Sequence, residues 1–108
     1  MNAHRLAEER SLAAHRIIAS RMRSDPSILE AARQRLEAWA RSGVMARSYA
    51  DEWRRILAGP PSEIATLLED PGDHARDMRQ VTPFAGALSP RERWRVWADV
   101  RESLERAG

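Results

Sequence analysis

The three histidines are the first side chains to consider for metal binding or acid–base chemistry. His4 and His15 lie eleven residues apart, which would place them on one face of a helix but about 16 Å apart along it at the usual rise per residue. They cannot share a metal ion at that separation, and neither belongs to a His-Glu-x-x-His pattern. We therefore expect both to have structural or surface roles.

His74 lies among three aspartates, Asp70, Asp73 and Asp77. On a helix, Asp73 and Asp77 would point their carboxylates to one side, and three acids with an imidazole could hold a divalent cation. Acids near a helix N-terminus also interact favourably with its dipole while remaining in water. We expect this second role; the sequence leaves ion binding open, and no metal or cofactor is predicted.

The composition removes several classes of chemistry. There is no cysteine, which excludes disulfides, thiolate nucleophiles and zinc sites that need sulfur. No nucleophile paired with a base and no glycine-rich phosphate loop can be found in the sequence. The longest apolar stretches are far too short to span a bilayer, and no signal-peptide pattern opens the chain. These features predict a cytoplasmic, non-catalytic protein that works by binding.

The charge of the chain is less basic than its isoelectric point of 10.3 suggests. All 18 basic residues are arginines, and 16 carboxylates nearly balance them, so the formal charge is only +2. Arginine titrates above pH 12, so a small excess of it raises the isoelectric point without creating a strong field at neutral pH. Arginine without lysine, together with abundant alanine, indicates the codon bias of a GC-rich bacterial genome.

Apolar residues recur at helical spacing along most of the chain, and no alternating strand pattern of useful length is present. Asp25 and Pro26 are predicted to begin a helix, and Gly43 to end it. We expect an all-α fold, a compact bundle of five or six helices in one domain spanning residues 1–108. The expected helices cover about 3–23, 26–42, 48–58, 62–69, 74–80 and 90–106.

The last of these helices begins at a complete capping box, Ser89-Pro90-Arg91-Glu92. Its apolar residues repeat at helical spacing, which predicts a buried stripe. Four tryptophans in so short a chain are many, and tryptophan is enriched in cores and in interface hot spots. Burial is the default expectation for most of them, and an exposed aromatic patch at Trp94 and Trp97 is the alternative. The predicted buried stripe consists of Trp94, Trp97, Val100 and Leu104, with Val96 beside it.

Two stretches of the chain, Glu9 to Arg16 and Val81 to Trp94, resemble segments of small helical bacterial proteins. Those proteins are encoded beside larger toxin-like nucleotidyltransferases and act as their antitoxin partners. The resemblance covers about a quarter of the chain and contains no catalytic motif. It implies that the protein binds a protein partner, such as a toxin.

The first functional hypothesis is therefore a protein-protein interaction module that uses arginine-rich helical faces and an aromatic anchor. Arginine suits this role because its planar fork pairs bidentately with carboxylates and stacks on aromatic rings. Pairing of two copies through the long first helix is left open. The predicted partner-binding residues are Phe84, Arg91, Arg93, Trp94 and Arg95.

The alternative hypothesis is a DNA-binding regulator. Residues 62–80 loosely follow a helix-turn-helix pattern, although the stretch 69–80 is net negative and its turn looks too long. The first 58 residues carry 11 arginines against 7 acids, and could face phosphates instead. The arginines predicted to do so are Arg16, Arg21, Arg23, Arg33, Arg35 and Arg47.

Overall fold

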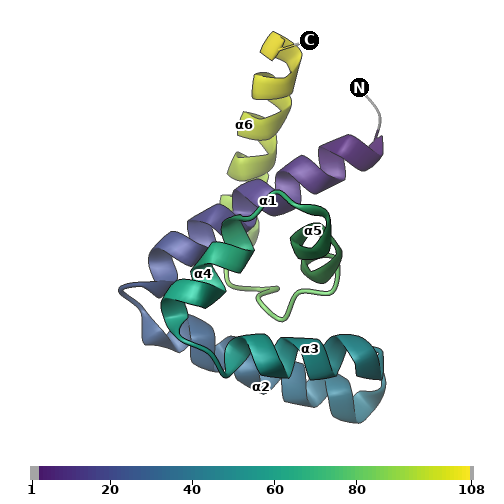
Figure 1. The fold of residues 1–108 in the computed structure, drawn as a ribbon. Helices are drawn as coiled ribbons and strands as arrows, with labels where there is room; N and C mark the ends of the chain where they lie inside the picture. The colour runs from purple at the N-terminus through teal and green to yellow at the C-terminus, as the bar shows by residue number, and fades with distance from the viewer. Residues whose placement is uncertain (1–2, 108) are drawn as a thin grey trace.

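The computed structural model describes residues 3–107, which form six α-helices and no strand (Figure 1). The all-α prediction is confirmed, and each helix begins and ends within one residue of the range expected from the sequence. The helices are α1 (Ala3–Met22), α2 (Pro26–Ser42), α3 (Arg47–Leu57), α4 (Pro61–Glu69), α5 (Asp73–Arg79) and α6 (Pro90–Ala107).

The predicted helix ends carry the predicted capping contacts. At the start of α2, the Asp25 carboxylate accepts a hydrogen bond from the Ser27 backbone N–H. Gly43 ends α2 with a left-handed φ of 79°, a conformation that glycine adopts without steric cost. At α6, the Ser89 hydroxyl accepts from the Glu92 N–H, and the Glu92 carboxylate accepts from the Ser89 N–H. This reciprocal pair satisfies two backbone donors that a helix end leaves unbonded.

We expect the substitution Ser89→Ala to lower the free energy of unfolding by about 1 kcal/mol, because it removes the acceptor of the Glu92 N–H. Urea denaturation monitored by circular dichroism measures the change. Ser48→Ala is the matched control, since Ser48 is exposed in the first turn of α3 and caps no helix there. Equal midpoints for the two variants would show that the box does not stabilise α6.

Helix α1 is the centre of the packing, because α2, α4, α5 and α6 all contact it. The core contains the fully buried Trp53 of α3, whose ring meets Phe84 edge to face with centroids 6.1 Å apart. Helices α2 and α3 lie side by side beneath α1 and α4 (Figure 1). The other large buried core side chains include Ile18, Leu36, Leu57, Ile64, Leu68, Met78 and Leu88.

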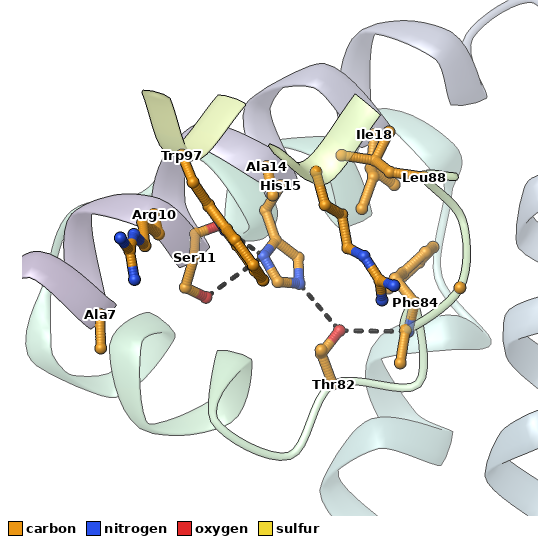
Figure 2. Close-up of a pocket in the computed structure, with 13 residues that line it drawn as sticks. Ala7, Arg10, Ser11, Ala14, His15, Ile18, Thr82, Phe84, Leu88 and Trp97 are labelled. Atoms are coloured by element: carbon orange, nitrogen blue, oxygen red, sulfur yellow. Dashed lines mark hydrogen bonds between the residues drawn. The ribbon is translucent and has the colours of Figure 1, made fainter. Parts of the chain in front are cut away.

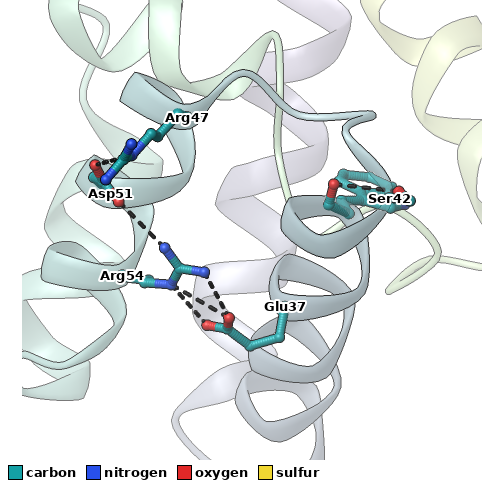
Figure 3. A network of polar contacts seen from close by, with 6 residues as sticks. Glu37, Ser42, Arg47, Asp51 and Arg54 are labelled. Carbon is teal, nitrogen blue, oxygen red and sulfur yellow. Dashed lines mark hydrogen bonds and ion pairs between the residues drawn. The ribbon is translucent and has the colours of Figure 1, made fainter.

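A polar network joins α2 to α3 at the surface (Figure 3). The Arg54 guanidinium donates to both carboxylate oxygens of Glu37, at 2.9 and 2.7 Å, and to Asp51 at 3.2 Å. Arg47 lies 4.0 Å from the same Asp51. Exposed ion pairs stabilise weakly, but the bidentate contact gives α3 a fixed position on α2.

The default expectation of burial is wrong for the two tryptophans of α6, and the alternative of an exposed aromatic patch at Trp94 and Trp97 is what the structure shows. Trp94 is 71% exposed and Trp97 is 40% exposed, while the neighbouring Val96 is buried. Helix α6 packs on α1, and its outer half projects beyond the other helices (Figure 1). A helix that packs mainly on one neighbour buries only a narrow strip, so the wide apolar stripe of α6 is covered only in part.

The dimensions of the molecule agree with this projecting helix. The Cα radius of gyration is 14.0 Å, against about 13 Å for a typical domain of this length. None of the helices within residues 3–107 is both long and apolar enough to cross a membrane.

Candidate functional site: a pocket between α1, α6 and their connector

The connector between α5 and α6, residues 80–89, is built into the core. Pro83, Phe84 and Leu88 are buried, and the Ala87 N–H donates to the Phe84 carbonyl to close a turn. Gly86 has a φ of +86°, which disfavours any side chain there. Arg35 of α2 donates to the Pro83 carbonyl at 3.2 Å. These contacts fix the connector against α2 while leaving its other side toward α1.

His15 attaches the same connector to α1 (Figure 2). Its Nδ1 lies 2.7 Å from the Ser11 carbonyl oxygen and its Nε2 lies 2.8 Å from the Thr82 hydroxyl. A carbonyl can only accept, so Nδ1 carries the proton and Nε2 accepts from the Thr82 O–H. The Thr82 oxygen in turn accepts from the Phe84 N–H at 3.1 Å. All three of these hydrogen bonds can form at once when the His15 ring is neutral.

Burial keeps His15 neutral. The side chain is only 4% exposed, and desolvation, assisted by the positive charge of Arg79 and opposed by the hydrogen bond to Ser11, lowers its pKa to about 4. Because both ring nitrogens are hydrogen-bonded and the pKa is low, His15 has a structural role: it holds the connector against α1. The expectation of a structural or surface role also fits His4, an exposed residue whose Nε2 lies 2.8 Å from Glu8 of the same helix.

A cavity of about 310 Å³ lies between α1, the connector and the start of α6 (Figure 2). Ser11, His15 and Thr82 supply its uncharged polar side chains, and His15 is hydrogen-bonded to the other two residues as described above. No carboxylate lines it. The remaining wall is largely apolar, formed by Ala7, Ala14, Ile18, Phe84, Ala85, Gly86, Leu88 and Trp97, and two arginines, Arg10 and Arg93, complete it.

Neither arginine of the pocket forms an ion pair with an acid among residues 3–107. The Arg10 guanidinium stacks over the Trp97 ring, with Cζ 5.2 Å from the ring centroid. The buried Nε atoms of Arg10 and Arg93 lack a hydrogen-bond partner within the described part of the chain. Elsewhere arginines pair with acids, as Arg21 does with Glu92 and Arg54 with Glu37. The pocket is therefore an apolar hollow with an uncompensated positive charge.

The hollow surface continues along α6 beyond the pocket. A second depression of about 280 Å³ shares Arg10 and Trp97 with the first. Trp94 and Arg101 line it from positions of α6 that lie on one helical face. We call the two depressions together the α1–α6 groove. The remaining residues of the second depression are Ala98, Glu102 and Glu105.

The predicted partner-binding residues fall into three positions relative to this groove. Trp94 lines it and is exposed, Arg93 lines the pocket, and Arg91 and Arg95 are exposed on α6. Phe84 differs from the prediction of an accessible anchor: its ring is 2% exposed and packs on Trp53. The connector folds back over α3, so the Phe84 ring is buried against Trp53 and contributes to the pocket wall instead of being accessible to a partner.

Sequence reasoning missed Arg10 as a member of the site, and it named Trp97 only as part of a possible exposed patch with Trp94. Residues 7, 10, 11, 14 and 18 of α1 share a helical face, so a mixed Arg, Ser and small apolar face was visible in the sequence. The sequence does not show that this face of α1 lies against the connector and the start of α6.

The arginines predicted to face DNA are mostly engaged within the chain. Arg33 donates to the Leu57 carbonyl and Arg35 to the Pro83 carbonyl. Arg16 is exposed on α1. The others pair with acids: Arg21 with Glu92, Arg23 with Glu69 and Arg47 with Asp51. These contacts leave little free charge for phosphates.

The helix-turn-helix pattern at residues 62–80 corresponds to α4 and α5. Only residues 70–72 separate the two helices, so the prediction that this turn is too long is wrong. The second helix nevertheless presents exposed Asp73, His74 and Asp77. In a helix-turn-helix protein this second helix would enter the major groove of DNA, where its exposed carboxylates would be repelled by the phosphates.

The aspartates around His74 are separated rather than convergent. Asp77 accepts from the Tyr49 hydroxyl at 2.8 Å, His74 lies 3.3 Å from Glu52, and Asp73 pairs with Arg76. Asp70 accepts from the Gly72 N–H. Within residues 3–107 no group of three acids or histidines is arranged to hold a metal ion.

The site as a whole is a hollow with aromatic and cationic walls, and its one imidazole is fully bonded. Such a surface can bind apolar and anionic groups. Comparison of the chain with family models, with curated proteins and with solved structures finds no match.

Proposed function

We propose that this protein is a non-catalytic interaction module that binds a protein partner at the α1–α6 groove. The observation that carries the proposal is the exposure of two tryptophans, Trp94 at 71% and Trp97 at 40%, on the projecting helix α6. Burying such rings stabilises a complex strongly, which is why tryptophan is enriched in interface hot spots.

The rigidity of the groove supports the same proposal. His15 and Arg35 hold the connector to α1 and α2, so the lower wall of the pocket is already formed before any partner arrives. A preformed surface loses less conformational entropy on binding than a mobile one.

The resemblance of residues 9–16 and 81–94 to antitoxin-like proteins supports a choice of first partner. Both stretches contribute residues to the pocket: Arg10 and His15 come from the first stretch, and Phe84 and Arg93 come from the second. We therefore propose a toxin-like nucleotidyltransferase as the first candidate, with this chain as its antitoxin or regulatory partner.

Affinity capture from a bacterial lysate containing the candidate partner, followed by titration calorimetry with the purified partner, tests the proposal. We expect Trp94→Ala to weaken binding at least tenfold. Truncation of a hot-spot tryptophan costs about 2 kcal/mol or more of binding free energy, and 2 kcal/mol corresponds to roughly a 30-fold change in the dissociation constant. Val44→Ala, which truncates another highly exposed apolar side chain, is the matched control and should bind normally. A partner that binds both variants equally well would show that the groove is not the interface.

A further inference from the structure

We infer that the pocket of the α1–α6 groove receives an apolar side chain of a partner segment that also carries carboxylates, which pair with Arg10 and Arg93. The inference rests on the proposed function and names the chemistry of the partner at this site. It follows from the charge, the shape and the continuity of the groove.

Charge complementarity gives the first step. Arg10 and Arg93 both line the pocket, neither guanidinium forms an ion pair with an acid within residues 3–107, and no acid lines the same wall. A guanidinium lacking a carboxylate gains most from one supplied in a planar, bidentate geometry. The ligand class that supplies it is a carboxylate, which no residue lining the pocket provides.

The lining of the pocket gives the second step. The surface between the two arginines is formed by Ile18, Phe84, Leu88 and the Trp97 ring, and the neutral His15 is bonded on both nitrogens. The His15 nitrogens are therefore not available to a ligand, and the aliphatic and phenyl side chains around them favour an apolar group. A leucine or phenylalanine side chain of the partner matches it, because burial of apolar area on both sides is favourable.

Continuity of the groove gives the third step and favours a polypeptide over a small molecule. The second depression extends the surface along α6 past Trp94 to Arg101. A compact ligand would fill about 310 Å³ in the pocket and leave the exposed Trp94 uncovered. An extended segment covers both depressions at once, with its carboxylates confined to the pocket, because Glu102 and Glu105 already line the second depression beside Arg101.

Synthetic peptides provide the test, with fluorescence anisotropy as the measurement. The probe is a short labelled peptide of glutamate, leucine and serine. Two comparison peptides replace every glutamate by glutamine or every leucine by serine. We expect the probe alone to bind measurably, with an affinity that falls as salt is added. Equal binding of the glutamine peptide, or no binding of any peptide, would overturn the inference.

Matched variants localise the binding. Arg10→Gln and Arg93→Gln are each expected to weaken probe binding about fivefold or more. Arg47→Gln removes the same charge from an almost fully exposed site on α3 and should leave binding unchanged. Ala85→Trp, placed at an exposed position of the pocket wall, should block binding, while Ala38→Trp on the exposed face of α2 should not. Thermal melts by circular dichroism verify that each variant is folded.

Failure of this inference and failure of the proposed function give different results. If a protein partner depends on Trp94 yet is insensitive to Arg10→Gln, Arg93→Gln and salt, the groove is an interface without the acidic recognition inferred here. Displacement of the probe by a single-stranded oligonucleotide would also overturn the inference, because the guanidiniums would then be serving phosphates.

Discussion

Replacing Phe84 by alanine is expected to lower the free energy of unfolding by about 3 to 5 kcal/mol, the usual cost of removing a fully buried phenyl ring. The ring is 2% exposed and packs edge to face on the buried Trp53. Its removal would leave a cavity under the connector that fixed neighbours cannot easily fill. Equilibrium urea unfolding followed by tryptophan fluorescence measures the change.

The contrast with Trp94 makes this prediction informative. Trp94→Ala truncates a larger ring, yet we expect a change in unfolding free energy within about 0.5 kcal/mol, because the side chain is mostly exposed. The two side chains were grouped as partner contacts from the sequence, yet we expect only Phe84 to contribute to the free energy of unfolding. A small loss for Phe84→Ala together with a large one for Trp94→Ala would contradict the packing described here.

Acidification from pH 7.5 to 5.0 is expected to destabilise the protein by about 2 kcal/mol through His15 alone. The unfolded chain protonates this imidazole below its ordinary pKa near 6.5, whereas burial holds the native pKa at about 4. Between these values the unfolded state binds the extra proton, so stability falls as the pH falls. Below about pH 4 both states are protonated and the loss stops growing.

Urea unfolding at both pH values, repeated for His15→Gln, isolates this contribution. The variant lacks the titrating ring, so its stability should depend less steeply on pH over the same range. His4→Gln is the control, because His4 is exposed at the start of α1 and should leave the dependence nearly as it is. Glu92 does not interfere, since its pairing with Arg21 and Ser89 lowers its pKa to about 2, below the interval measured.

A direct titration of His15 by nuclear magnetic resonance complements the unfolding data. Its ring protons should remain at their neutral chemical shifts through pH 5 if Nδ1 donates to Ser11 and Nε2 accepts from Thr82. A midpoint near 6.5 would show that the ring is solvated and that the connector is not pinned to α1 in this way.

Local sequence signals determined the helices of this protein because each signal acts over a single turn. Asp25 and Pro26 begin α2, Gly43 ends it in the left-handed conformation, and the Ser89 box begins α6. Helical periodicity and capping depend on neighbours within four residues, so a single sequence suffices to read them.

Only the tertiary structure decided which faces of these helices are covered. The apolar stripe of α6 does not reveal that α6 packs mainly on α1, along a narrow strip, and leaves Trp94 outside. Nor does it reveal that Phe84 fills the core, or that Arg10 and Arg93, 83 positions apart in the sequence, line one pocket. Burial and convergence depend on the number and placement of neighbouring elements, which are set by contacts between residues distant in the chain.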